Sequence, residues 1–276
     1  MAKISIIIPV HNAERSITKT LESVIAAAKM VGDAEIVCVD DGSTDNSPSI
    51  LDEQRAKVLS STSTLNFNFI VIHQENAGAY AARNAGASAS GGEWLAFVDA
   101  DDLVESDIYV KLLAFAKANN LQVAECDIVG YDKVGRQNDL WLGRDEVRNN
   151  LVIPWLIEGN EASFMWDKIY RRDVWRNVTH PSYIFMYDDL MTNLQVFRSV
   201  ERFGILHERM YHYQINAGSS IRHFGKRNIR DFREIVTFRK TACEWYGIKS
   251  NDSRMKQWYR KNLINNIKLA IKAWFL

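Results

Sequence analysis

Cysteine is scarce in this chain, and its scarcity excludes two kinds of site. The three cysteines, Cys38, Cys126 and Cys243, are odd in number and widely separated. A structural zinc site needs closely spaced cysteine or histidine pairs, and a disulfide framework needs an even set of cysteines in a small secreted chain. The sequence has neither pattern and favours a reducing compartment.

Long apolar runs and linkers are absent as well. The apolar run over residues 4–10 stops at His11, which makes it too short for a signal peptide, and no later run reaches the length of a membrane span. No repeat, low-complexity segment or linker rich in Pro, Gly and Ser interrupts the 276 residues. We therefore expect a cytoplasmic protein that folds as one compact unit with a C-terminal helical extension.

Neither sign of charge is in excess, but the charges are unevenly distributed. The chain holds 34 Lys and Arg against 34 Asp and Glu. Residues 1–130 hold 9 basic against 18 acidic residues, a net charge of −9, whereas residues 222–276 hold 14 against 4, a net charge of +10. An acidic first half suits cation binding, and a basic tail suits phosphate groups or an anionic surface.

The first 130 residues alternate apolar runs with helical patterns. We predict strands over 4–10, 36–40, 67–73, 94–98 and 123–131, and helices over 16–30, 47–57, 79–89 and 106–119. Strands that are apolar on both faces and separated by helices indicate a parallel sheet covered on each side. Ligands of such sheets bind at the carboxyl ends of the strands, so the polar residues there are the candidate site.

Three motifs at these strand ends carry chemistry. The segment 99–102 (Asp-Ala-Asp-Asp) offers hard oxygen ligands to Mg²⁺ or Mn²⁺ and leaves positions open for a diphosphate. The alternative is that Asp102 or Ser106 caps the next helix. Asp41 in 39–45 can accept a hydrogen bond from a nucleobase, or belong to a turn and helix cap. Arg83 in 76–86 can reach phosphate, pair with an aspartate, or lie on the surface.

The order and spacing of these motifs resemble the family 2 glycosyltransferases. The likeness covers residues 3–115 and continues more loosely to about residue 225. The matching motifs read Pro9-x-His11-Asn12-x-Glu14, Val39-Asp40-Asp41-Gly42-Ser43-x-Asp45, Asn76-x-Gly78-(x)₄-Arg83-Asn84-x-Gly86 and Gly92-Glu93-(x)₅-Asp99-x-Asp101-Asp102.

The resemblance implies an α/β fold of the GT-A type, an open and mostly parallel sheet flanked by helices. It implies a catalytic domain over 1–225, with a nucleotide-sugar half over 1–130 and an acceptor half over 131–225. Residues 226–276 form the basic helical extension.

The resemblance also assigns the residues that bind the donor. The nucleoside, which we expect to be uridine, is held by Pro9, His11, Glu14 and Asp41. His11 stands where the family usually has Tyr, which makes the preference for uracil less secure.

Further donor contacts fall on the other two motifs. Asn76 and Arg83 lie near the ribose, the diphosphate or the acidic cluster. Asp99 contacts ribose or sugar and shares the metal, Mn²⁺ or Mg²⁺, with Asp101. Asp102 contacts the sugar or supports the turn.

Inverting transfer needs a base that takes the proton of the acceptor hydroxyl. The family has a Glu-Asp pair for this, and Asp188-Asp189 occupies the matching context, with Asp188 where Glu is usual. We predict Asp189 as the base and Asp188 beside it as an acceptor contact; capping of a helix is the alternative for both. His212, in the segment 211–214, is a further candidate for donor or metal.

The segment 254–276 has a helical pattern with an apolar and a basic face. The apolar face holds Tyr259, Leu263, Ile267, Ile271 and Trp274, and the basic face holds Arg254, Lys261, Lys268 and Lys272. Such a helix can lie peripherally on the inner, anionic face of a membrane, pack on the catalytic domain, or pair with a second copy.

Together these features predict metal-assisted transfer of a single sugar from a UDP-sugar to a glycan or lipid-linked acceptor, in surface polysaccharide synthesis. The alternative is a non-catalytic module that binds nucleotide sugars. A phospho-acceptor receiver domain is excluded because its acidic pair should follow the first strand, where this chain has Pro-Val-His-Asn. We expect no nucleic-acid partner, and the sequence does not identify the transferred sugar, the acceptor or the oligomeric state.

Overall fold

The computed structural model describes residues 3–60, 67–129, 145–149, 164–176, 178–179, 187–214 and 226–249, and single positions between 253 and 264. These residues form a nine-stranded sheet in the order β3-β2-β1-β4-β8-β6-β9-β5, with β7 paired to β9. The strands are β1 (Ile4–Val10), β2 (Ala34–Asp41), β3 (Phe67–Gln74), β4 (Trp94–Phe97), β5 (Leu103–Val104), β6 (Val123–Val129), β7 (Glu146–Asn149), β8 (Lys168–Arg171) and β9 (Arg202–His212).

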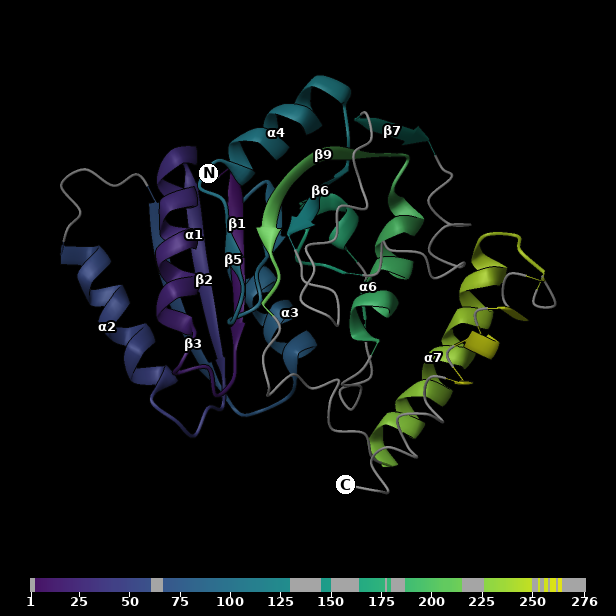
Figure 1. Cartoon of the computed structure of the whole chain (residues 1–276), viewed down its shortest axis with the longest axis horizontal. Helices are drawn as coiled ribbons and strands as arrows, with labels where there is room; N and C mark the ends of the chain where they lie inside the picture. Colours follow the sequence, from purple (N-terminus) through teal and green to yellow (C-terminus); the bar gives the residue numbers. More distant parts are fainter. Residues whose placement is uncertain are drawn as a thin grey trace.

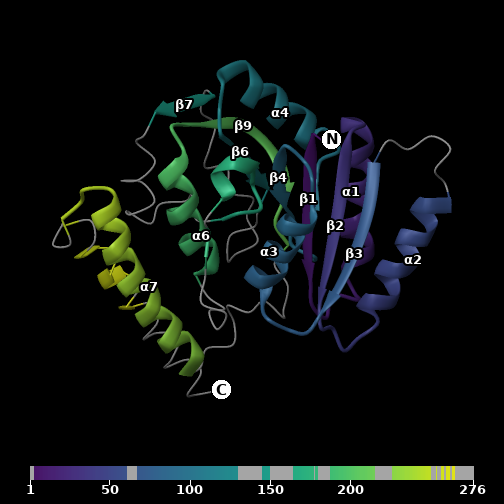
Figure 2. The same ribbon diagram turned by 180° about the vertical axis from the view of Figure 1, so that it is seen from behind.

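Helices cover both faces of this sheet. They are α1 (Ile17–Val31), α2 (Ser47–Ser60), α3 (Ala79–Ala89), α4 (Ile108–Asn119), α6 (Asp188–Val196) and α7 (Lys226–Trp245), with 3-10 turns η1 (Arg172–Trp175) and η2 (Phe197–Ser199). Helix α1 lies in front of the sheet and α3 behind it in Figure 1, and the order is reversed in Figure 2. The predicted α/β class with a helix-flanked open sheet is confirmed.

The sheet is parallel only in its first part. Strands β3, β2, β1 and β4 run parallel to one another, with Ile4 level with Ala34 on one side and Trp94 on the other. Beyond β4 the sheet is mixed, because β8 runs antiparallel to both β4 and β6, whereas β6 and β9 are parallel. The helix predicted over 106–119 begins at Ile108, and residues 130–131 of the last predicted strand lie outside the described part.

Two hydrophobic cores lie on opposite faces of the sheet because successive side chains of a strand point to opposite sides. In β1, Ile6 and Ile8 belong to the core under α1 and α4. Ile7 belongs to the other core, together with residues of α3, α6 and α7. The alternation explains why β1 is apolar on both faces, apart from Ser5.

Helix α7 is part of the second core. Phe232, Ile235 and Ala242 are buried there, and the Tyr246 hydroxyl, just after the helix, donates a 2.6 Å hydrogen bond to the Leu194 carbonyl of α6. The division of the chain at residue 225 stays a prediction.

Of the predicted amphipathic face, Tyr259 and Leu263 are described. Tyr259 stacks on Phe232, and Leu263 packs against the second core. Lys261 is exposed, as predicted for the basic face. The predicted positions outside the described residues are Arg254, Ile267, Lys268, Ile271, Lys272 and Trp274. None of the helices in the described residues is both long and apolar enough to cross a bilayer.

Candidate active site

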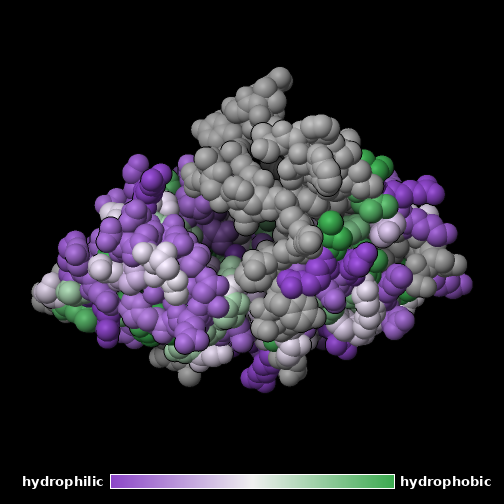
Figure 3. All heavy atoms as spheres, turned by 90° about the horizontal axis from the view of Figure 1, so that it is seen from below, coloured by the Kyte–Doolittle hydropathy of each residue, from purple (hydrophilic) through white to green (hydrophobic). Residues whose placement is uncertain are grey.

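Strands β1 and β2 end side by side, with Val10 level with Asp40, so the loops that follow them meet at one edge of the sheet. Asn12, at a φ of 52°, donates its N–H to Ser43 and accepts the N–H of Thr44. Glu14 accepts two hydrogen bonds from Asn46, at 3.1 and 3.0 Å. This edge faces the viewer in Figure 3, where hydrophilic residues predominate on the side of the first strands.

Asp41 is buried, and both of its carboxylate oxygens are engaged within the protein. One oxygen accepts hydrogen bonds from Gln74 Nε2 at 2.7 Å and the Ala77 N–H at 2.9 Å, and the other accepts from the Gly78 N–H at 2.8 Å. The side chain thereby fixes the loop that leads into α3. Its direct role toward a nucleoside stays a prediction, and its observed role is to order the loop beneath that site.

His11 and Asn76 lie together on this loop cluster. His11 Nδ1 is 2.9 Å from the Asp41 carbonyl oxygen, which can only accept, so Nδ1 carries the proton in this bond. The amide nitrogen of Asn76 is 3.3 Å from His11 Nε2. A Cβ on Gly42 would lie 2.7 Å from the backbone nitrogen of Asn76, so the close approach of the two loops requires glycine there. Pro9 is half-buried near the end of β1.

The acidic turn after β4 is held from two sides. The Ala100 carbonyl accepts hydrogen bonds from Ser16 at 2.9 Å and Thr20 at 3.0 Å, both near the start of α1. On the other side, the Tyr211 hydroxyl donates to Asp102 at 2.8 Å. Asp102 also accepts the backbone N–H of Gln214 at 2.7 Å.

Asp102 is fully buried, and its two hydrogen bonds hold the turn; its contact with a sugar stays a prediction. Burial, together with the negative charge of Asp99, raises the pKa of Asp102 to about 8. Asp101 is half-buried on the same turn.

Arg83 is the centre of the site. Its guanidinium is buried and donates to Asp99 at 2.8 Å, to Asp188 at 2.9 Å and to Asp189 at 3.2 Å. Although burial disfavours its charged form, the carboxylates of Asp189, Asp99 and Asp188 raise the pKa of Arg83 above its ordinary value. The predicted pairing of Arg83 with the acidic cluster is therefore observed, and it reaches two segments more than 80 residues apart.

Asp188 and Asp189 begin helix α6, and side-chain contacts hold that helix in place. Asn193, one turn along α6, accepts a hydrogen bond from Tyr170 at 2.9 Å and donates to the Phe164 carbonyl at 3.1 Å. Tyr187 stands at the N-cap position and makes no side-chain cap, and both aspartates lie in the first turn of the helix. Their roles as base and acceptor contact stay predictions. Burial raises the pKa of both carboxyls above the usual aspartate range, even beside Arg83.

A comparison with known families identifies the family of this chain. The profile described as "Glycosyl transferase family 2" matches residues 5–185. The chain belongs to glycosyl transferase family 2. The match contains the acidic turn and Arg83, and it ends just before Asp188.

Family 2 relatives span several organisms. The chain is 30% identical to the uncharacterized glycosyltransferase EpsJ of Bacillus subtilis (strain 168) over 226 residues, which cover 78% of this chain and 62% of EpsJ. It is 36% identical to the poly(ribitol-phosphate) beta-glucosyltransferase of Bacillus spizizenii over 123 residues, 44% of this chain and 18% of that enzyme. The family 2 chain therefore spans less than two thirds of the length of these relatives.

Solved structures share the fold. TarS 1–349 of S. aureus in complex with UDP superposes with a TM-score of 0.66 at 21% identity, over 86% of this chain and 65% of that one. The mannosyltransferase PcManGT of Pyrobaculum calidifontis, in complex with GDP-Man and Mn²⁺, gives a TM-score of 0.59 at 16% identity, over 88% and 64%. These neighbours support the GT-A fold of the family 2 chain.

The donor set at the acidic turn fits a hard divalent cation shared with a ligand. Among the described residues, no group of three or more His, Cys, Asp or Glu side chains could hold a metal by itself. Mg²⁺ is usually held by one or two carboxylates together with water and phosphate oxygens, rather than by an all-protein cage. Asp99 and Asp101 of the family 2 chain supply such carboxylates at the end of β4.

His212 of the family 2 chain has another partner. Its Nε2 lies 2.6 Å from Glu105 on the segment next to β5. The assignment of His212 to donor or metal stays a prediction, and the observed contact ties β9 to the start of α4.

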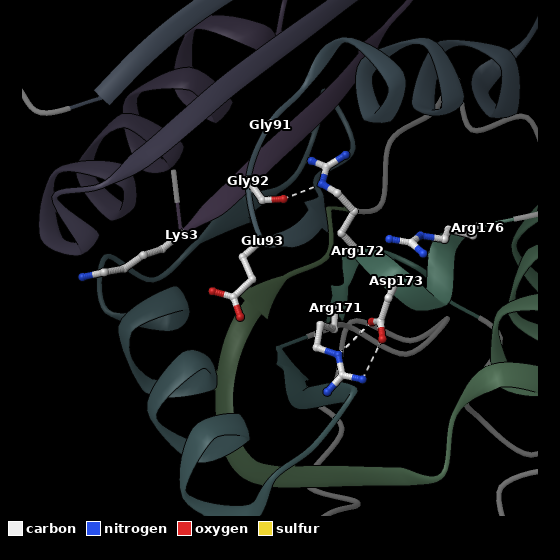
Figure 4. Close-up of a pocket in the computed structure, with 8 residues that line it drawn as sticks. All are labelled: Lys3, Gly91, Gly92, Glu93, Arg171, Arg172, Asp173 and Arg176. Carbon is white, nitrogen blue, oxygen red and sulfur yellow. Dashed lines mark hydrogen bonds and ion pairs between the residues drawn. The ribbon is translucent and has the colours of Figure 1, made fainter. Parts of the chain in front are cut away.

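One hollow of the described surface lies away from these residues. It has a volume of about 410 Å³ and is lined by Lys3, Gly91, Gly92, Glu93, Arg171, Arg172, Asp173 and Arg176. Figure 4 shows Arg172 turned to the Gly92 carbonyl and Arg171 paired with Asp173. This hollow is at the amino end of β1 and β4, opposite to the ends where ligands of open α/β sheets bind.

Sequence reasoning gave no role to several residues that build this family 2 site. Tyr211 lay in a quoted segment, yet its hydroxyl bridges Asp102 and the Asp99 N–H. Ser16 and Thr20 have the i, i+4 spacing of one helix face, which is the signal that they act together. Lys168 is fully buried between Asp167 at 2.6 Å and Glu125 at 2.9 Å.

Proposed function

We propose that this protein is an inverting glycosyltransferase that moves a single sugar from a UDP-sugar to a glycan or lipid-linked acceptor, with Mn²⁺ or Mg²⁺ assisting. The observation that carries the proposal is the buried Arg83, which joins Asp99 of the acidic turn to the Asp188–Asp189 pair. Because one guanidinium contacts all three, the carboxylates proposed for metal and for base lie within one small site.

The donor side is proposed from the loop cluster. Pro9, His11, Glu14 and Asp41 would hold the nucleoside, either directly or, for Asp41, through the loop that it orders. Asn76 beside His11 would reach the ribose. The UDP complex of the structural neighbour TarS supports uridine as the nucleoside.

The metal would be held by Asp101 and Asp99 together with the diphosphate. Its chemistry is to offset the negative charge that develops on the leaving nucleoside diphosphate. The Mn²⁺ complex of PcManGT supports a metal in this fold.

The proposed sugar transfer is a single displacement that needs one base. The acceptor oxygen forms a bond to the anomeric carbon from the side opposite the diphosphate, the bond from that carbon to the diphosphate oxygen breaks, and the diphosphate leaves with the electron pair. Asp189 takes the proton of the acceptor hydroxyl. Asp188, held by the same Arg83, would contact the acceptor. Inversion follows from the single displacement.

The acceptor belongs to surface glycan synthesis on the cytoplasmic side of a membrane. The relative that acts on poly(ribitol-phosphate) supports a surface polymer. The net charge of +10 over residues 222–276, from 14 basic and 4 acidic residues, supports an acceptor at an anionic surface.

The test is donor binding and turnover with matched variants. The purified protein is titrated with UDP-, GDP- and dTDP-sugars with and without Mn²⁺, and donor hydrolysis and transfer are followed. We expect one UDP-sugar to bind with metal, Asp101→Asn to abolish this binding, and Asp189→Asn to keep binding but lower kcat by about 10²- to 10⁴-fold. The control is Asp173→Asn, at the opposite end of the sheet.

Each outcome decides between the two hypotheses. If no nucleotide sugar binds the wild-type protein, the donor site is wrong. If a donor binds with metal but is never transferred or hydrolysed, the non-catalytic module replaces the enzyme. If Asp189→Asn keeps full turnover, the base lies elsewhere.

A further inference from the structure

The residue before the aspartate pair has an unusual backbone. Tyr187 has a φ of 65°, in the left-handed region, and it directly precedes Asp188 at the start of α6. A bulky side chain rarely adopts this conformation, and it persists only where its surroundings hold it. The direction in which Asp188 and Asp189 leave the chain therefore depends on what holds Tyr187.

A ring of helix α7 is one of the groups that hold it. Phe232 is 6% exposed and packs on Tyr187, with ring centroids 6.3 Å apart and ring planes at 49°. Tyr259, beyond α7, stacks on Phe232 at 5.9 Å. The same core contains Leu190 and Met191 in the first turn of α6.

Helix α7 and the residue after it contact α6 near both of its ends. Besides the contact of Phe232 at the beginning, the Tyr246 hydroxyl donates to the Leu194 carbonyl in the last turn. Figures 1 and 2 show α7 beside α6 from opposite sides. The acidic turn, by contrast, is held by the start of α1 and by β9, and the loop before α3 is held by Asp41 at the end of β2.

We propose that α7 is a positioning element for the Asp188–Asp189 pair, and that Phe232 is its positioning residue, acting through Tyr187. The proposal rests on the proposed function, which assigns the base to this pair. Its consequence is a separation of effects: loss of the Phe232 ring lowers kcat, while the donor and the metal bind as before.

The test compares two aromatic truncations on the same helix. Phe232→Ala should lower kcat by about ten- to a hundredfold, since small misplacements of catalytic groups have effects of this size, with the KM for the UDP-sugar and the Mn²⁺ dependence unchanged. Phe232→Leu should recover most of the loss. The control is Trp245→Ala, which removes a ring that packs on Phe238 and under Arg198 instead, and which should keep the wild-type kcat.

A second variant covers the case in which Phe232→Ala fails to fold. Tyr187→Asn removes the other ring and keeps a residue that tolerates the left-handed backbone. It should lower kcat as Phe232→Ala does, and the double variant with Phe232→Leu should lose no more than Tyr187→Asn alone.

The outcomes separate this proposal from the proposed function. Equal kcat in wild type, Phe232→Ala and Tyr187→Asn overturns the role of α7, while wild-type transfer itself stands. A parallel rise in the donor KM also overturns it, because the effect then reaches the whole site. Absence of any transfer in the wild type overturns the proposed function instead.

Discussion

Arg83 balances the charge of the site only in part. One guanidinium faces the carboxyls of Asp99, Asp188 and Asp189, so the cluster has an excess of negative charge when all three are ionised. Burial opposes that state, because it raises the pKa of Asp188 and Asp189. Removing a buried partner leaves uncompensated charges, which is among the most destabilising single changes in proteins. An excess of negative charge next to Asp101 favours the binding of a divalent cation. The negative net charge of the first half of the chain is consistent with such a site.

The stability of the sheet edge where β2 and β3 end depends on pH through His73. A hydrogen bond from His73 Nδ1 to Asp40 at 3.0 Å raises the pKa of His73, with a weaker contact to Asp52. Because the folded state binds this proton more tightly, the contribution to stability is complete below the unfolded pKa of about 6.5 and is lost as the pH rises through the raised value. His73→Gln should therefore lower the Tm more at about pH 5.5 than at about pH 8.5.

The measurement is thermal unfolding of both proteins across that range in one buffer system. A difference in Tm that stays constant, or that widens with rising pH, contradicts the assignment. Asp52→Asn should show the same trend with a smaller amplitude, because its contact to His73 is longer, at 3.4 Å.

Helix α3 sets the position of Arg83 through its close approach to the sheet. A Cβ on Gly86 would lie 2.5 Å from Ile7 Cγ2 and 3.2 Å from Val39 Cγ2. Gly86→Ala should push α3 outward, lower the free energy of unfolding by about 1–3 kcal/mol and weaken donor binding, since Arg83 is less than one turn away.

Denaturant unfolding and donor titration measure the two effects. The control is Gly91→Ala, where a Cβ meets only Glu35 Oε1 at 4.0 Å and no loss is expected. Wild-type stability in Gly86→Ala would show that α3 tolerates a wider spacing.

The elements that the sequence predicted are those with a local signal. Strand β1 was predicted at its observed bounds because all of its residues, apart from Ser5 and Pro9, are buried and apolar. Strand β8 was not predicted from the sequence, because its four residues include the charged Lys168 and Arg171. Lys168 is buried only because Asp167 and Glu125 neutralise it, and that partnership exists only in three dimensions.

The same limit applies to the site. The acidic turn and Arg83 each lie in a contiguous sequence motif, so the sequence alone could predict their chemistry. The contact of Arg83 with Asp188 joins residues that are 105 positions apart in the sequence. Hydrophobic periodicity predicts only local structure, so it could not predict this contact. The contact of Phe232 with Tyr187 was equally invisible, because the basic pattern after residue 225 indicated an extension rather than a part of the core.

The uneven charge of the chain predicts binding to anionic vesicles. Lys256, Arg260 and Lys261 line one exposed hollow near the C-terminus. Each basic residue near an anionic surface contributes about 1 kcal/mol, so reversing Arg260 and Lys261 to Glu should weaken sedimentation with anionic vesicles at least roughly tenfold. Binding should also fall as salt is added.

The matched control reverses Lys29 and Lys57 in the acidic half to Glu. Equal binding to neutral vesicles, or equal loss in both double variants, contradicts a membrane contact through this segment. In that case packing on the catalytic domain, of which the Tyr259 contact is an example, accounts for the helix.

Strand β4 is an inner strand of the sheet, and one of its two neighbours is synthesised much later than β4 itself. It pairs with β1 on one side and with β8 on the other, where Leu95 is level with Tyr170. On the ribosome, β8 emerges only after the 70 residues between Phe97 and Lys168 have been added, which takes roughly 4–14 s at ordinary elongation rates. Until then the nascent chain has an open apolar edge, a template for aggregation, and Arg83 lacks Asp188 and Asp189. A fragment that stops before residue 168 would keep that edge open permanently, so the first half of this chain depends on its second half to stay soluble.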